Sequence, residues 1–176
     1  MKELYSERLL LRPFLEADIC DAYIVGVNNT EIVRLTEARH QQWSRDDIVQ
    51  YVRACNQGEF SDLIGLFDRE SHTHLGNIRL SGFSRIHRRI DLGIMIYNLN
   101  YQGRGLGTEA LLALDAYVFD ELALHRICAD YYSINAASAR MFEKAGWRIE
   151  GIFREHFYLD GRFVDSVRVA KLSGKS

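Results

Sequence analysis

The sequence predicts an α+β fold with a mixed, mostly antiparallel sheet. The chain of 176 residues is 47% hydrophobic and 26% charged, which is ordinary for one globular domain. Short apolar runs separated by polar turns fill its middle, as expected of consecutive antiparallel strands. A glycine-rich loop then joins the last of these runs to a helical apolar pattern. Without a linker or an internal repeat, residues 1–176 should form a single domain with about four helices flanking the sheet.

The first elements expected along the chain are a strand and two helices. Leu9–Arg12 is β-like, and Pro13 should end this strand because proline cannot continue a paired ladder. Apolar spacing then predicts a helix over Glu16–Val25. A second helix should begin at Ser44, which resembles a capping box with the aspartate of the next turn, and should end near Gly58.

The pattern changes to strands from Asp62 onward and returns to helices after the glycine-rich loop. The strands should be Leu63–Phe67, Gly76–Leu80 and Arg89–Ile96, which pair antiparallel. A helix from Thr108 and a strand at His125–Tyr132 follow, and Asn135 can cap a helix that ends at Gly146. A hairpin of Trp147–Phe157 and Arg162–Leu172, with its turn at Asp160-Gly161, completes the chain.

Composition argues against several classes of protein. A net charge of −2 and a pI near 6.3 give no basic footprint for nucleic acid. The chain has no signal-peptide pattern and no apolar run long enough to cross a membrane, and so we expect a cytoplasmic protein. Cys20, Cys55 and Cys128 lack disulfide or zinc spacing. His72 and His74 should lie at an exposed hairpin tip, and no metal is expected.

The glycine-rich loop is the strongest candidate for a binding site. Gly103, Gly105 and Gly107 allow the backbone to turn tightly and to approach a ligand, so that successive N–H groups can converge on an anion. The helix that follows adds its unpaired first-turn donors and its dipole. A ligand that carries phosphates is therefore the first hypothesis.

Other interpretations of the loop compete with this one. Gly105, Gly107 and Ala110 match a dinucleotide-binding fingerprint, with Asp130 at the position of a ribose-binding acid. That fold needs a series of parallel strands, whereas the chain before the loop predicts antiparallel ones. A Walker loop would need Gly-Lys-Ser or Gly-Lys-Thr after its cradle, which is missing here. A glycine-rich turn that binds nothing remains the simplest alternative.

Taken together, the motifs resemble the GNAT superfamily of acyl-CoA-dependent N-acetyltransferases, in particular its RimJ/RimL-type branch. Gln102-x-x-Gly105-x-Gly107 matches the pyrophosphate-binding signature of that superfamily. Further matches are Glu7–Pro13, Thr108-Glu109-Ala110, Asn135-x-x-Ser138 and Phe142–Trp147. The resemblance covers about residues 6 to 172, and these four further motifs stand in the family's order around the signature.

The resemblance implies that the co-substrate is acetyl-CoA. It also implies that Leu92–Ile96 bulges and splays away from the strand at His125–Tyr132, so that backbone groups face the pantetheine arm. The implied cofactor-binding residues are Ile94, Met95, Ile96, Gln102, Gly103, Arg104, Gly105, Leu106, Gly107, Thr108, Asn135, Ser138 and Phe142. Asn135 could instead cap its own helix, which competes with a role in binding the pantetheine amides.

The catalytic roles also come from the resemblance. Asp91 is the first candidate for removing the proton of the amine, through water, and a solvated or salt-bridged strand residue is the equal alternative. The backbone N–H near Met95 should hold the oxyanion. Many relatives have a tyrosine at the position of Phe142, and a phenylalanine side chain cannot protonate a thiolate as a tyrosine can. Ser138 is the replacement, as a hydrogen-bond donor.

The acceptor is the least defined part of the prediction. The resemblance places the acceptor cleft near the first two helices, where Arg34, Glu37, Arg39 and Trp43 are candidate substrate-binding residues; a solvated helix face explains them equally well. A protein N-terminus, an amino sugar, a polyamine or an aminoglycoside would each fit. The alternative function is a non-catalytic acyl-CoA-binding sensor on the same fold. Relatives also make a homodimer an open alternative to a monomer.

Overall fold

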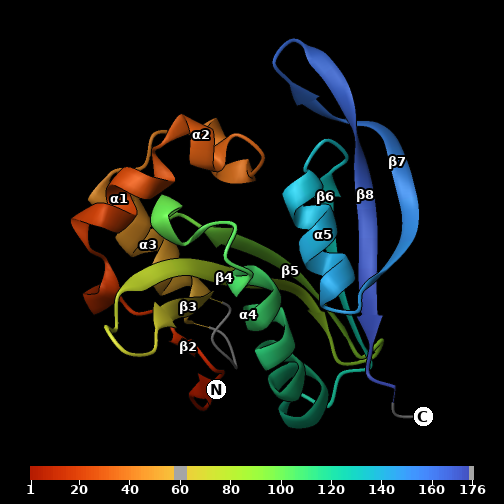
Figure 1. Ribbon diagram of the computed structural model, residues 1–176, viewed down its shortest axis with the longest axis horizontal. Coiled ribbons are helices and arrows are strands. Elements are labelled where there is room, and N and C mark those ends of the chain that lie inside the picture. Colours follow the sequence, from red (N-terminus) through yellow and green to blue (C-terminus); the bar gives the residue numbers. More distant parts are fainter. Residues whose placement is uncertain (58–62, 175–176) are drawn as a thin grey trace.

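The computed structural model describes residues 1–57 and 63–174 and confirms the α+β prediction (Figure 1). The strands are β1 Leu4–Tyr5, β2 Leu9–Pro13, β3 Leu63–Asp68, β4 His74–Ser84, β5 Arg89–Ile96, β6 Arg126–Tyr132, β7 Arg148–Leu159 and β8 Arg162–Leu172. They form one sheet in the order β1-β2-β3-β4-β5-β6-β8-β7. The described pairs are antiparallel except β5 with β6, which is parallel.

Helices cover both faces of this sheet. They are α1 Asp21–Val27, α2 Thr30–Val33, α3 Arg45–Cys55, α4 Leu106–Asp115 and α5 Ala136–Lys144, with a π-helical segment Ala116–Glu121 after α4. Short 3-10 turns lie at Glu16–Asp18, Glu37–His40 and Leu99–Tyr101. No helix within residues 1–57 and 63–174 is long and apolar enough to cross a bilayer.

The first helical segment differs from its prediction. Instead of one helix over Glu16–Val25, a 3-10 turn ends at Asp18 and α1 begins at Asp21. The Asp18 carboxylate explains the break, because it accepts hydrogen bonds from the Leu15 N–H at 2.8 Å and from the Arg12 guanidinium at 2.7 and 2.8 Å. Local polar pairing thus overrides apolar spacing.

Other element ends also moved. The first strand ends at Pro13 as predicted, but Pro13 is itself the last strand residue and pairs with Ile64. The capping box at Ser44 is confirmed, since its hydroxyl accepts from the Asp47 N–H at 3.1 Å and its N–H donates to the Asp47 carboxylate at 2.9 Å. The helix that it starts ends at Cys55, and the predicted end near Gly58 lies outside the described residues.

His74 corrects the expectation of an exposed histidine tip. Only His72 takes the tip, with φ of 56°, whereas His74 opens β4 and is 6% exposed. Its ring stacks on Phe14 with centroids 4.4 Å apart, inside a box that also contains Tyr23 and Tyr97. The turn closes one residue earlier than the sequence indicated, because the Asp68 N–H donates to the Thr73 carbonyl.

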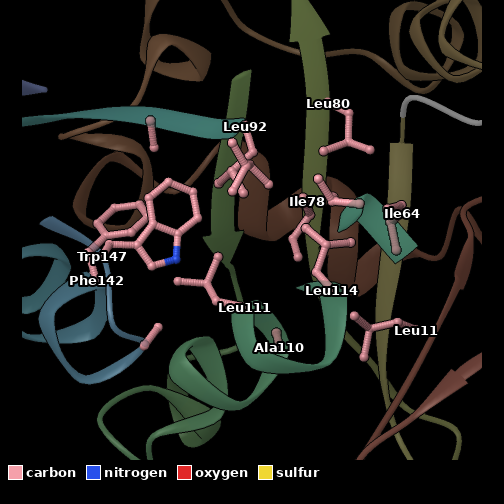
Figure 2. Close-up of a cluster of buried hydrophobic side chains, with 14 of the residues drawn as sticks. Leu11, Ile64, Ile78, Leu80, Leu92, Ala110, Leu111, Leu114, Phe142 and Trp147 are labelled. Atoms are coloured by element: carbon pink, nitrogen blue, oxygen red, sulfur yellow. The ribbon is translucent and has the colours of Figure 1, made fainter. Parts of the chain in front are cut away.

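The core has one layer on each side of the sheet. In Figure 2, Ala110, Leu111 and Leu114 of α4 face a row of strand side chains that includes Ile78 and Leu92. On the opposite face, α1 and α3 pack Tyr23, Ile48 and Val52 against Leu63 and Phe67 of β3. Each β-strand in the middle of the sheet therefore contributes alternate residues to the two layers.

The sheet opens between β5 and β6, as the prediction of a splayed strand pair required (Figure 1). The two strands pair only at Arg89, Ile90 and Asp91, and β5 continues to Ile96 without pairing to β6. The predicted bulge within Leu92–Ile96 is wrong, because β5 keeps an unbroken register with β4 over that stretch. The register shift lies in β4 instead, between Ser81 and Ser84, where Gly82 has φ of 60°.

Candidate active site

Two cavities meet where β5 and β6 separate. The larger has a volume of about 790 Å³ and lies over the α1/α3 side of the sheet at the splay. The smaller, of about 470 Å³, extends along the glycine-rich loop and α5. The residues that line both are Leu35, Thr36, Ile94, Met95, Asn135 and Ser138. A ligand in the smaller cavity would thus present one end to a ligand in the larger.

The loop has the geometry expected of an anion cradle. Gly103 and Gly105 have φ of 71° and 80°, values that only glycine adopts readily, and Gly105 is the N-cap of α4. A Cβ at Gly103 would meet no atom within 4 Å, so the space above the loop is open. Gly107 serves packing as well, because a Cβ there would lie 2.5 Å from the Met141 sulfur on α5.

Side chains hold this loop from both sides. The Gln102 amide donates to the carbonyl of Ile96 at 2.7 Å and so ties the loop to the end of β5. Behind the loop, Arg8 donates to the carbonyl of Arg104 at 3.0 Å and to both carboxylate oxygens of Glu109 at 2.7 Å. The hydroxyl of Ser6 adds another hydrogen bond to Glu109 at 2.7 Å.

Glu109 is therefore part of the frame of the loop. Burial raises the pKa of its carboxyl, but the hydrogen bonds from Ser6 and Arg8 and the charge of Arg8 outweigh burial, and the net pKa is lowered. The carboxylate is the form that the structure stabilises. The sequence prediction missed this network, which joins the segment between β1 and β2 to α4.

Most of the predicted cofactor-binding residues come together. Those that line the smaller cavity are Ile94, Met95, Ile96, Gln102, Gly103, Gly105, Leu106, Gly107, Thr108, Asn135 and Ser138. Arg104 instead places its guanidinium 5.5 Å from the ring centroid of Tyr101. Phe142 lies on the larger cavity. The Asn135 side chain accepts from the Ser138 N–H at 3.0 Å, so its capping role is confirmed, and its amide group still lies where the cavities meet.

Asp91 lies on the wall of the larger cavity within a chain of ion pairs. Its carboxylate accepts from Arg168 of β8 and lies 3.4 Å from the Arg89 guanidinium. Arg168 also donates to Asp130 of β6. Burial lowers the pKa of Arg168, but both carboxylates raise it further, so the guanidinium stays charged. The salt-bridged alternative for Asp91 therefore holds, and Asp91 also lines the larger cavity.

The wall of the larger cavity beside Phe142 contains a phenol that sequence reasoning missed. Tyr131 of β6 stacks on Phe142, with centroids 5.9 Å apart and planes at 18°, and both residues line the larger cavity. Burial, and then the charge of Glu143, raises the pKa of Tyr131, so its hydroxyl remains protonated. Ser138 shares this wall. No local motif marks Tyr131, because only the packing of α5 on β6 brings it beside Phe142.

The predicted acceptor residues divide into two groups. Glu37 and Trp43 line the larger cavity, and Glu37 accepts from the Tyr132 hydroxyl at 3.0 Å. Arg34 and Arg39 instead bind the tip of the β7–β8 hairpin, through the Asp160 carboxylate and the Tyr158 carbonyl at 2.8 Å. These two arginines hold the α2 region against the hairpin. Cavity residues that the sequence prediction missed are Asn77, Arg79, Tyr131, His156 and Arg168.

The residues present fit an acyl-CoA. Its diphosphate matches the open backbone donors of Gly103–Thr108, and its pantetheine amides match the unpaired edge of β5. Within the described residues, no cluster of histidine, cysteine and acidic side chains could hold a metal ion. These features suit a phosphorylated carrier along the smaller cavity beside a second molecule in the larger.

Comparison with known proteins identifies the family. Residues 8–148 match the model of the acetyltransferase (GNAT) domain, so the chain belongs to the GNAT family of acetyl-CoA-dependent N-acetyltransferases, as its motifs indicated. The uncharacterized N-acetyltransferase YoaA of Bacillus subtilis is 27% identical over 165 residues, which are 93% of this chain and 92% of that protein.

Two further relatives act on different amines. Spermidine N(1)-acetyltransferase of Escherichia coli is 26% identical over 144 residues, covering 74% of this chain and 76% of that protein. RimL, a ribosomal L7/L12 alpha-N-protein acetyltransferase solved with coenzyme A, superposes with a TM-score of 0.86 at 18% identity, covering 97% of this chain and 98% of that one. At 18% identity, this likeness shows that the two chains share a fold.

Proposed function

We propose that this protein transfers an acetyl group from acetyl-CoA to a primary amine by direct attack in a ternary complex. The observation that carries the proposal is the meeting of the two cavities at Ile94, Met95, Asn135 and Ser138, beside the edge of β5 that β6 leaves unpaired. A carrier along the smaller cavity and an amine in the larger would be held together. Such proximity can lower a barrier by about 7–11 kcal/mol.

The cofactor-binding roles follow from this placement. Gly103–Thr108 would hold the diphosphate through main-chain N–H groups, and Ile94, Met95 and Ile96 would pair with the pantetheine amides. Acetyl-CoA supplies the activated acetyl group when bound. The N–H near Met95 would stabilise the negative charge on the carbonyl oxygen.

The chain offers groups for both proton movements. Asp91 would receive the proton that the amine loses, through water, since its carboxylate lies on the cavity wall. The N–C bond forms as the C–S bond breaks, and Ser138 or Tyr131 would hydrogen-bond the departing sulfur. A thiolate with a pKa of about 8.5 needs little help to leave, so this last role is a modest one.

The acceptor is a primary amine of a polar molecule. Relatives named for spermidine and for a ribosomal protein N-terminus make both a polyamine and a protein N-terminal amine candidates. Cys20, Cys55 and Cys128 form no disulfide with one another, which suits a reducing compartment, so we place the reaction in the cytoplasm.

A panel of amines with acetyl-CoA tests the proposal by thiol release. Turnover with at least one polyamine, amino sugar or peptide N-terminus is expected, together with thermal stabilisation by acetyl-CoA alone. Stabilisation without turnover for any amine would favour the non-catalytic sensor. Neither stabilisation nor turnover would contradict both functions.

A further inference from the structure

A buried amide on the floor of the larger cavity has donors with no partner. Asn77 of β4 is 6% exposed and lines that cavity, and its Nδ2 has no hydrogen-bond partner among the described residues. Leaving a buried N–H₂ without an acceptor is costly, and native structures rarely do so unless a ligand or water supplies the acceptor. This amide therefore calls for an explanation.

The orientation of the amide is fixed by its neighbours. Nε2 of His74 lies 2.9 Å from the carbonyl oxygen of Gly76 and 2.7 Å from Oδ1 of Asn77. A carbonyl can only accept, so Nε2 must carry the proton and donate it. The atom of Asn77 that faces this N–H must then be its oxygen, because a flipped amide would oppose two donors. Nδ2 is left without an acceptor, on a residue that lines the larger cavity.

The histidine is held in the state that this arrangement needs. Burial lowers the pKa of His74 to about 4, against the opposing effect of its hydrogen bonds with Asn77 and Gly76. The ring is therefore neutral at pH 7, with its single proton on Nε2. Stacking on Phe14 and an edge contact with Tyr23, at centroid distances of 4.4 and 5.0 Å, fix the plane of the ring.

Asn77 occupies the acceptor side of the site. It pairs directly with Met95 across β4 and β5, so their side chains share one face of the sheet. Met95 lines both cavities, whereas Asn77 lines only the larger one. Asp91 lies four residues before Met95 on β5 and therefore on the same face. Asn77, which has the amide donor, and Asp91, which has the carboxylate, thus line the same cavity.

We propose that Asn77, oriented by His74, selects acceptor amines that carry a hydrogen-bond-accepting oxygen near the amine, such as the carbonyl of a peptide N-terminus or a sugar hydroxyl. This inference rests on the proposed acetyl transfer. A protonated polyamine offers only donors, and it would leave Nδ2 unsatisfied. The site thus disfavours polyamines and favours α-amino carbonyl compounds or amino sugars.

The test compares two acceptors that differ in one oxygen, L-alaninamide and 1,2-diaminopropane. For each acceptor, kcat/KM by thiol release is measured for the wild type and for Asn77→Asp, which replaces the free donor by an acceptor of the same shape. Taking the ratio of variant to wild type for each amine cancels its intrinsic reactivity. We expect at least about a tenfold loss for alaninamide and a gain for the diamine.

Two further variants keep the test decisive if a buried carboxylate prevents folding. Asn77→Leu removes the donor without adding charge and should lower the preference for alaninamide. His74→Phe keeps the stacked ring but frees the amide, and it should reduce the same preference while acetyl-CoA still stabilises the protein. A rotated Asn77 changes selectivity, whereas a general packing defect lowers turnover of both acceptors alike.

The outcomes separate this inference from the proposed function. Equal losses for both acceptors in every folded variant would overturn the role of Asn77 and leave acetyl transfer standing. Absence of thiol release from the wild type with every amine would overturn the proposed function, and the inference with it.

Discussion

Replacement of Gly105 by alanine tests whether the loop conformation is what binds the diphosphate. Gly105 has φ of 80°, and a Cβ there would meet only Nη2 of Arg8, at 3.8 Å. The protein can accommodate the methyl group, so the main internal cost is that of a left-handed conformation, about 1–2 kcal/mol. For a chain of this length, that cost lowers Tm by about 2–8 °C.

Gly161 provides a matched control. It has φ of 81° in the turn between β7 and β8, and a Cβ there would meet nothing within 4 Å. Gly161→Ala should therefore lose the same stability as Gly105→Ala. Only the latter places a methyl group in the cradle or turns its N–H groups away from the ligand, and its Kd for acetyl-CoA should rise at least about tenfold.

Calorimetric titration of acetyl-CoA into both variants, with thermal unfolding of each, measures the two effects separately. Equal affinities for acetyl-CoA in the two variants would refute the assignment of Gly105 to the cradle. Equal losses of stability with unequal affinities are the expected result. A much larger loss of stability at Gly105 would mean that strain, and not ligand contact, dominates there.

Three other changes probe the frame and the chemistry. Asp91→Asn should lower kcat/KM by about 10²–10⁴ and alter its pH profile, and an unchanged profile would remove Asp91 as the proton acceptor. Glu109→Gln should destabilise the protein by about 1.5–3 kcal/mol at neutral pH. Because folding lowers the pKa of Glu109, its carboxylate stabilises the protein above the ordinary pKa of 4.5, and this stabilisation is lost as the pH falls below that value. Urea unfolding measures the free-energy difference between the wild type and Glu109→Gln, and a difference that does not change with pH would contradict this. Tyr131→Phe should reduce kcat by about tenfold or less with unchanged acetyl-CoA affinity, and weaker affinity instead would assign Tyr131 to packing.

Local signals account for the parts of the site that the sequence predicted. The glycine spacing of the loop and the cap at Asn135 each depend on a few consecutive residues, and both have the predicted conformation. The splay between β5 and β6 was also foreseen, from the family resemblance. The bulge that should have accompanied it was misplaced, because Ser81 pairs with Asp91 and Ser84 with Arg89, so the extra residue lies in β4 at Gly82 and Phe83.

Contacts between distant strands account for what the sequence could not predict. Arg168 meets Asp91 only because β8 lies beside β6, and Asn77 faces the cavity only through its register with Met95. The sequence predicts an exposed turn at His74 because the residues before it are polar, yet its neighbours in space are Phe14 and other aromatic rings. Register and strand order decide these contacts, and neither can be read from a short segment.

The central claim is that main-chain amides of β5 and of the loop hold the cofactor, and amide hydrogen exchange with and without CoA tests it most directly. CoA should slow exchange within Leu92–Ile96 and Gly103–Thr108, while Arg89–Asp91, already paired with β6, should change little. Unchanged exchange in both of the first two segments at saturating CoA would contradict the account.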